Sequence, residues 1–129
     1  PGTVGTWKIS VVGFLPNAND AMHQANPFND KPKAGQQYVL VTLRATNTGK
    51  KSATAYFELS FSLIPMSGTS VEPALAIAPD DLSDRNNVPA GASAEGTIPF
   101  MVPTKDVPSV VLYIEDLSFN THSAFFAVR

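Results

Sequence analysis

A strict alternation of side-chain types along residues 38–47 constrains the fold of this chain more than any other feature. Val39, Val41, Leu43 and Ala45 share one face of this segment, and the residues between them share the other. A period of two residues is that of a β-strand with one face buried in a core. The segment is therefore predicted to be a central strand.

The same alternation recurs in several other short segments. Residues 57–63 place Phe57, Leu59, Phe61 and Leu63 on one face, which predicts a second central strand. The remaining strands are predicted at residues 7–14, 70–72 (a short edge strand), 96–102, 110–115 and 124–128, the last with Phe126 and Val128 inward.

Turn-forming residues separate these segments, and the eleven prolines and eight glycines are spread along the whole chain. Residues 17–37 are polar and contain Pro27, Pro32 and Gly35, so a long loop with at most one helical turn is expected there. Pro99 cannot donate a hydrogen bond within a sheet, so its amide side should face an edge or a bulge.

About seven short strands, with no convincing 3.6-residue period, predict an all-β fold. Strands of this number and length, joined by Gly, Pro and Asn turns, are typical of an immunoglobulin-like sandwich of two antiparallel sheets. The length of 129 residues falls within the usual range for one domain, and no linker or repeat interrupts it. A single domain spanning residues 1–129 is expected.

The composition excludes several classes of function. The chain has no cysteine, which rules out disulfides, thiolate metal sites and a cysteine nucleophile. Nine basic and eleven acidic side chains give a net charge of −2, and the chain has no run of basic residues. A nucleic-acid partner is therefore not expected. No apolar run approaches the roughly 20 residues that a transmembrane helix needs, so a water-soluble globule is expected.

Several ordered motifs carry a family resemblance. They are Asn26–Asn29 (NPFN), Pro32–Val41 (PKAGQQYVLV), Thr46–Gly49 (TNTG), Phe61–Leu63 with Ser67-Gly68, Pro89–Gly91 (PAG) and Gly96–Pro103 (GTIPFMVP). Together with Trp7 near the start, their order and spacing resemble the bacterial family known as domain of unknown function 4352. The resemblance covers nearly the whole chain.

This resemblance implies an immunoglobulin-like sandwich of the kind found largely on exported proteins and lipoproteins of Gram-positive bacteria. The chain is also distantly similar to a secreted immunoprotective antigen of mycobacteria. No catalytic residues come with the family. The chain begins at Pro1 without an initiator Met or an apolar signal segment. We therefore expect an extracytoplasmic protein, secreted or anchored as a lipoprotein, whose targeting segment has been removed.

Two sets of residues are candidate metal ligands. Oxygen ligands of the kind that calcium prefers cluster at Asp80, Asp81 and Asp84, followed by Asn86 and Asn87, although their spacing is not that of an EF-hand. The alternative interpretation is an ordinary loop, where such side chains bond their own backbone. A copper site could recruit thioether and imidazole groups from Met22, His23, Met66, Met101 and His122, although no close His-x-Met pair supports it.

Nothing in the sequence singles out a catalytic site. No Gly-x-Ser-x-Gly motif occurs, and no pair stands out among the acidic residues Glu58, Glu72, Glu95, Glu115 and Asp116. The chain is not expected to be an enzyme, and no catalytic, cofactor-binding or metal-binding residues are assigned.

Aromatic residues offer a different kind of site. By alternation, Tyr38, Tyr56 and Tyr113 lie on outer faces of the sheets, where a group of them would form a partner surface. Phe28 lies in the polar loop and either anchors a partner or folds back to plug the end of the sandwich. We expect the plug, because burying a Phe stabilises a fold by about 1.5–3 kcal/mol.

The sequence thus favours an extracytoplasmic interaction or structural module that recognises a protein or cell-envelope partner. The alternative is a metal or small-ligand carrier that uses the Asp80 region or the Met/His set.

Overall fold

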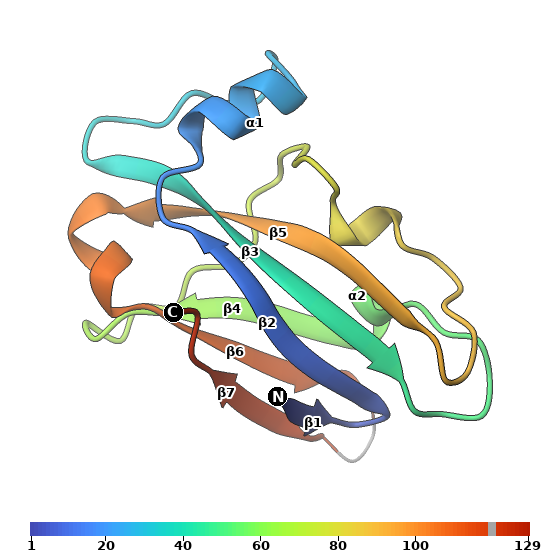
Figure 1. Cartoon of the computed structure of the whole chain (residues 1–129). Helices are drawn as coiled ribbons and strands as arrows, with labels where there is room; N and C mark the ends of the chain where they lie inside the picture. The colour runs from blue at the N-terminus through green and yellow to red at the C-terminus, as the bar shows by residue number, and fades with distance from the viewer. Residues whose placement is uncertain (119–120) are drawn as a thin grey trace.

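Two antiparallel sheets packed face to face form the body of the protein (Figure 1). The computed structural model describes residues 1–118 and 121–129. One sheet has the order β1-β2-β3-β5 and the other the order β4-β6-β7. The strands are β1 (Gly2–Val4), β2 (Trp7–Leu15), β3 (Gln36–Asn47), β4 (Leu59–Ile64), β5 (Ser93–Pro103), β6 (Val111–Asp116) and β7 (Ser123–Phe126).

The strand order is that of the immunoglobulin fold, as predicted. β2, β3 and β5 take the places of strands A, B and E, and β4, β6 and β7 take those of C, F and G. Residues 73–81 run where strand D would lie, beside β5, but they pair with it only through isolated bridges at Pro73 and Asp81. β1, a strand that the alternation pattern does not predict, lies next to β2.

The main core fills the space between the two sheets. The predicted inward face of β3 is completely buried, and Leu59, Phe61 and Leu63 of β4 meet it from the other sheet. Val110, Leu112, Ile114, Phe126 and Val128 complete this layer and are buried, as predicted. The last strand is shorter than predicted, because β7 ends at Phe126 and Val128 packs inward beyond it. One continuous apolar cluster therefore joins both sheets.

The predicted strand at residues 57–63 begins too early. Residues Ala55–Glu58 form one helical turn, α2, in which the amides of Phe57 and Glu58 donate to the carbonyl of Thr54. The strand starts only at Leu59, so Phe57 leaves the alternation and its side chain is 69% exposed instead of inward. A local turn of backbone hydrogen bonds has overridden the two-residue period at this end.

The edges of the sheets differ from the prediction at one point and agree at another. Residues 70–72 form only a single bridge, between Val71 and Leu63, and not an edge strand. Pro99 lies on β5, the edge strand of its sheet, and its carbonyl accepts from Ala74 on the side away from β3. Its missing amide hydrogen therefore faces the edge, as expected.

A second, smaller core lies on the outside of the first sheet, beneath α1 (Asn19–Ala25). This helix is longer than the single turn that the composition of residues 17–37 predicts. It brings Ala18 and Met22 against Tyr38, Leu40 and Ala78, all of them buried. The outward side of β3 is therefore covered at this end, and the prediction that Tyr38 faces solvent is wrong.

Two 3-10 helices complete the fold, η1 (Leu82–Asp84) beside β5 and η2 (Thr104–Ser109) between β5 and β6. Along the described part of the chain, no helix has the length and apolar character needed to cross a membrane.

Candidate binding surfaces

Among the predicted calcium ligands, Asp80 and Asp81 interact with other protein groups, whereas Asp84, Asn86 and Asn87 are exposed. Asp81 is buried and caps η1, its carboxylate accepting from the amides of Ser83 at 2.9 Å and Ala78 at 3.4 Å. Asp80 is exposed and lies 3.8 Å from Arg85. Within residues 1–118 and 121–129, no group of three or more His, Asp or Glu side chains is placed to hold a metal ion. The acidic loop is thus ordered by bonds to its own backbone.

The proposed copper ligands are divided among separate places. Met22 and Met101 pack in the small core beneath α1, while His23 is exposed on that helix. Met66 is exposed at the turn after β4, and His122 lies just before β7, at the other end of the sandwich from α1 (Figure 1). The fold does not gather this set into one site.

The three tyrosines do not form a common surface either. Tyr38 is buried beneath α1, and Tyr56 on α2 stacks against Phe61 with ring centroids 6.0 Å apart. Tyr113 lies on the outer face of the second sheet, 4.8 Å from the ring of Phe125.

Phe28 is 93% exposed, so the prediction that it plugs the sandwich is wrong. The Asn26 side chain accepts from the Phe28 amide at 3.0 Å, and the Asn26 carbonyl accepts from the Asn29 amide at 3.1 Å. This tight turn carries the Phe28 ring at its tip. The small core that it could have entered is already filled by Met22 and Tyr38.

Asn29 joins this turn to the segment that replaces strand D. Its Nδ2 donates to the carbonyls of Ile77 at 2.8 Å and Met22 at 2.9 Å, and its Oδ1 accepts from the Ile77 amide at 2.9 Å. The amide side chain thus pairs with the Ile77 backbone as a neighbouring strand would. Phe28 and Ile77 are held side by side as a result.

Residues 74–78 have an inverted apolar pattern. The small side chains of Ala74, Ala76 and Ala78 pack against the core beneath α1, whereas the large side chains of Leu75 and Ile77 are exposed. A strand that only closed a core would normally place its large aliphatic residues inward. This extended segment instead presents them to solvent.

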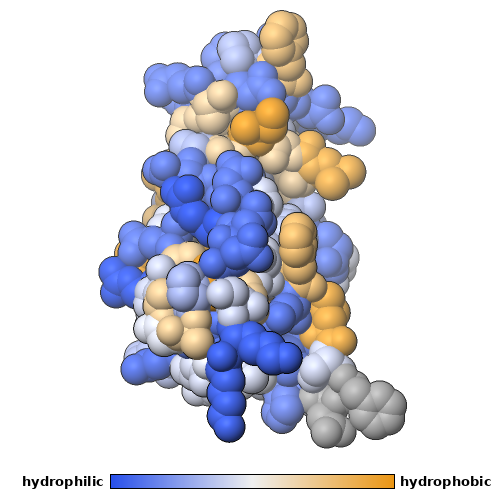
Figure 2. All heavy atoms as spheres, turned by 90° about the vertical axis from the view of Figure 1, so that its right-hand side faces the viewer, coloured by the Kyte–Doolittle hydropathy of each residue, from blue (hydrophilic) through white to orange (hydrophobic). Residues whose placement is uncertain are grey.

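Phe28, Leu75 and Ile77 surround a shallow groove of about 510 Å³, which we call the Phe28 groove. Figure 2 shows apolar side chains gathered in the upper part of this side of the molecule. Asp30 and Asp81 are the charged residues among those that line the groove in the described structure. The surface therefore combines apolar contact area with negative charge.

A second hollow, of about 650 Å³, lies between the β1–β2 turn, α2 and the connection from β6 to β7. We call it the Trp7 hollow. Its apolar lining comes from Trp7, Phe57 and Leu117. Its polar lining comes from Thr6, Glu58, Asp116, Ser118 and His122.

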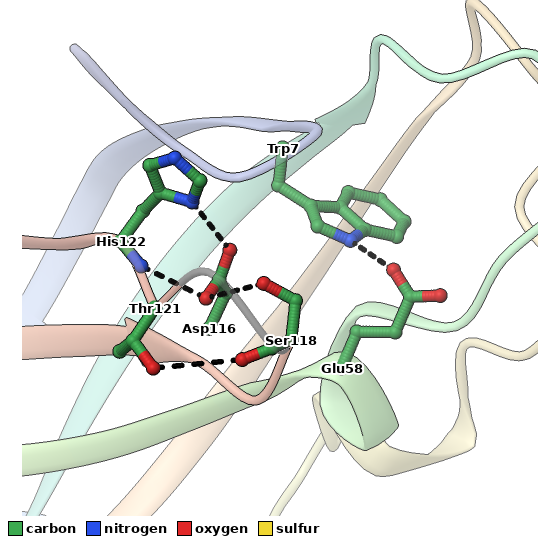
Figure 3. A network of polar contacts seen from close by, with 6 residues as sticks. All are labelled: Trp7, Glu58, Asp116, Ser118, Thr121 and His122. Atoms are coloured by element: carbon green, nitrogen blue, oxygen red, sulfur yellow. Dashed lines mark hydrogen bonds and ion pairs between the residues drawn. The ribbon is translucent and has the colours of Figure 1, made fainter.

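Trp7 and Glu58 form the inner wall of the Trp7 hollow. The indole Nε1 of Trp7 donates to Oε1 of Glu58 at 2.9 Å (Figure 3). Trp7 is buried at the start of β2, so its ring is fixed by the main core. The hydrogen bond holds the Glu58 carboxylate against this ring and links the first sheet to α2.

Asp116 closes the connection between β6 and β7. Its Oδ1 accepts from the His122 amide at 2.9 Å and the Ser118 hydroxyl at 3.0 Å, and its Oδ2 lies 3.0 Å from Nδ1 of His122 (Figure 3). The hydrogen bond from the His122 amide is the main reason that the pKa of Asp116 is lowered, with further lowering by the His122 and Ser118 side chains. A buried carboxylate is thus kept ionised.

The β1–β2 turn approaches this carboxylate closely. Gly5 has a φ of +59°, and a Cβ at this position would lie 2.5 Å from Oδ2 of Asp116. Only glycine suits both the conformation and the space. In Figure 3 the second ring nitrogen of His122 points away from Trp7 and Glu58, so the Asp116–His122 pair does not direct a base toward the hollow.

The Trp7 hollow is not predicted by the sequence. Its main hydrogen bond joins residues 51 positions apart, and Phe57 enters it only because α2 interrupts the expected strand. No local spacing could have indicated this pairing.

The two antiparallel sheets, packed face to face in the immunoglobulin-like order, place this chain among the small β-sandwich domains. The chain belongs to the family described as domain of unknown function (DUF4352), whose model matches residues 4–124. No curated protein matches this sequence.

Three solved structures are similar to this chain at low sequence identity. A conserved hypothetical protein from Bacillus anthracis is 12% identical, with a TM-score of 0.48, over 73% of this chain and 71% of that one. An uncharacterized β-sandwich protein from Clostridium difficile 630 is 9% identical, with a TM-score of 0.48, over 98% and 83%. The putative ApaA protein from Bordetella pertussis is 16% identical, with a TM-score of 0.42, over 96% and 89%.

Proposed function

We propose that this protein is an extracytoplasmic interaction module that binds a protein partner through the Phe28 groove and catalyses no reaction. The observation that carries the proposal is the inverted pattern of residues 74–78. Small alanines face the core there, and Leu75 and Ile77 face solvent next to Phe28.

The energetics favour binding at this surface. Burying each large apolar side chain against a partner is worth about 1.5–3 kcal/mol. The Asn29 hydrogen bonds already hold the turn and the extended segment together, so association pays little to order their backbone. Clustered apolar side chains on a fixed frame are typical of the central contacts of an interface.

The charge of the groove defines the partner more closely. Asp30 is exposed beside Phe28, and the described lining of the groove contains no Lys or Arg. An acidic, apolar surface complements a protein segment that carries apolar side chains next to a Lys or Arg. Such a segment is the occupant that we propose.

The extracytoplasmic location is supported by the resemblance to domains found on exported proteins and lipoproteins. Protease added to intact cells tests it. An extracytoplasmic domain is digested unless the surrounding envelope shields it, and permeabilising the outer layers alone exposes it. A domain that stays protected until the cytoplasmic membrane is opened contradicts this location.

Site-specific photo-crosslinking tests the partner and the surface together. Benzoylphenylalanine placed at residue 28 in the producing cells should capture one protein, whereas the same group at the exposed Met66 should not. The captured segment is then synthesised and titrated against the purified domain. Leu75→Ser and Ile77→Ser should each weaken its binding about tenfold, which corresponds to about 1.4 kcal/mol, and Met66→Ser should not. Equal capture at both positions, or undiminished binding by the serine variants, contradicts the proposal.

A further inference from the structure

We propose that the Trp7 hollow is a second binding site, which takes an ammonium or guanidinium group carried on an apolar stem. This site and the Phe28 groove share no lining residue, and different residues of α2 line them: Tyr56 lines the groove, whereas Phe57 and Glu58 line the hollow. The inference does not depend on the function proposed for the groove.

Such a ligand requires a fixed negative charge for its cationic group and an apolar surface for its stem. Glu58 provides the negative charge. Its Oε1 is fixed by the indole Nε1–H of Trp7 at 2.9 Å, and its side chain is exposed to the hollow. Glu58 forms no ion pair with any Lys, Arg or His in the described structure. A carboxylate held by one oxygen keeps acceptor positions for a charged donor, which makes the stronger kind of hydrogen bond.

The surrounding charges reinforce this preference. Asp116 adds a second carboxylate to the lining, and its oxygens are already used by His122 and Ser118. No Lys or Arg is among the described residues that line the hollow. Lys50 and Lys51 line an adjoining cleft that also contains Glu58, but no ion pair joins them to it in residues 1–118 and 121–129.

The apolar walls provide the second requirement, a surface for the stem of the ligand. Phe57 is 69% exposed and Leu117 is 63% exposed, both beside the hollow. An aromatic face attracts a cation electrostatically, and an aliphatic wall buries methylene groups. The volume of about 650 Å³ lies within the range of small-ligand pockets, roughly 300–1,000 Å³.

Other ligand classes fit less well. Two carboxylates disfavour an anion, and the Asp116–His122 pair is occupied in closing the β6–β7 connection. A cation on an apolar stem contacts both the Glu58 carboxylate and the apolar side chains of Phe57 and Leu117. It could be a free amine or the side chain of a Lys or Arg in a polypeptide.

The single tryptophan of the chain gives a direct measurement. Trp7 has one indole N–H, and its proton resonance reports on the Glu58 carboxylate to which it is bonded. The probes are 2-phenylethylammonium, the neutral 2-phenylethanol, 3-phenylpropionate and the dipeptide N-acetyl-Phe-Lys-amide. The two cationic probes should shift this resonance saturably, the alcohol should bind about tenfold more weakly and the carboxylate should not bind.

Matched variants locate the binding. Glu58→Gln keeps an oxygen that can accept from Trp7 but removes the charge, and it should weaken the cationic probes about tenfold. Glu72→Gln removes an exposed charge outside the hollow and should change nothing. Phe57→Ser, at an exposed position, should also weaken binding. Leu75→Ser should leave it unaltered, which separates this site from the Phe28 groove.

The outcomes are distinguishable. Tighter binding of the dipeptide than of 2-phenylethylammonium identifies a polypeptide side chain as the source of the cation, and equal binding identifies a free amine. Equal affinity for the alcohol and the ammonium probe, or full binding by a folded Glu58→Gln variant, overturns the proposal.

Discussion

Two aromatic residues close in sequence differ completely in their surroundings. Tyr38 is buried beneath α1 and its hydroxyl donates to the Asp30 carbonyl at 2.7 Å, whereas Phe28 stands in solvent. Burial, with a smaller contribution from the charge of Asp30, raises the pKa of Tyr38. The residue with a polar group lies inside and satisfies it, and the purely apolar residue lies outside. Hydropathy alone would assign them the other way round.

Because Phe28 is exposed, its replacement is predicted to have little effect on the stability of the fold. Phe28→Ala should change the free energy of unfolding by no more than about 0.5 kcal/mol, as for other exposed positions. Phe100→Ala, at a completely buried position of β5, should cost about 3–5 kcal/mol. Urea denaturation measures both. A large loss for Phe28→Ala would mean that this ring is buried in solution.

A second prediction concerns the acid sensitivity that Asp116 confers. Its pKa is lowered in the folded protein from an ordinary value of 3.8, so its ionised form stabilises the fold above that pH. This contribution is lost as the pH falls below about 3.8 and through the folded-state pKa. Asp116→Asn should therefore unfold more easily at neutral pH than the native protein and show a smaller difference from it in acid.

Melting temperatures between pH 2.5 and 7 in buffers of equal ionic strength measure this difference, with Asp84→Asn as an exposed control. Parallel curves for Asp116→Asn and the native protein would contradict the assigned role.

Among the elements, most strands could be predicted from local sequence, whereas the short helices that cover the sheets could not. The alternation at residues 38–47 correctly predicts β3 and its buried face, because the two-residue period is a property of the backbone. α1 and α2 have only 7 and 4 residues, too few to show a helical period. The Trp7–Glu58 pair and the Asn29–Ile77 pair depend on contacts 51 and 48 residues apart. Most of the strands and the main core could thus be predicted. Phe28 could be singled out as a possible anchor, but the long-range contacts that complete the two binding surfaces could not be predicted.

The contact between β5 and η1 gives a prediction at this scale. A Cβ at Gly96 of β5 would lie 2.6 Å from Cα and 2.9 Å from the backbone nitrogen of Leu82. Backbone atoms cannot move aside as a flexible side chain can, so Gly96→Ala should destabilise the protein by about 1–3 kcal/mol. Gly13→Ala in β2 meets Thr42 only at an ordinary 3.4 Å. Its unfolding midpoint in urea should remain close to native, and equal effects of both changes would argue against this packing.

In the whole molecule, the two proposed surfaces share one support. Tyr56, Phe57 and Glu58 of α2 stand between the Phe28 groove and the Trp7 hollow. α2 itself is attached to the first sheet by the Trp7 hydrogen bond and leads directly into β4 of the second. Apolar side chains appear in both the upper and the lower parts of the side shown in Figure 2. α2 therefore contributes side chains to both surfaces, Tyr56 to the groove and Phe57 and Glu58 to the hollow.

Because the two sheets share one core, we expect residues 1–129 to unfold as one unit. The main cluster contains buried residues from both sheets, and Trp7 lies in it, so neither sheet can keep its core without the other. Trp7 fluorescence, which reports on the shared core, and far-ultraviolet circular dichroism, which reports on all strands, should give the same urea midpoint. Glu58→Ala, which removes the acceptor of the Trp7 indole N–H, should lower both midpoints together, because this hydrogen bond links the first sheet to α2 and does not belong to one sheet alone. Two separate transitions, or a fluorescence change that precedes the loss of strand signal, would show instead that the sheets unfold independently.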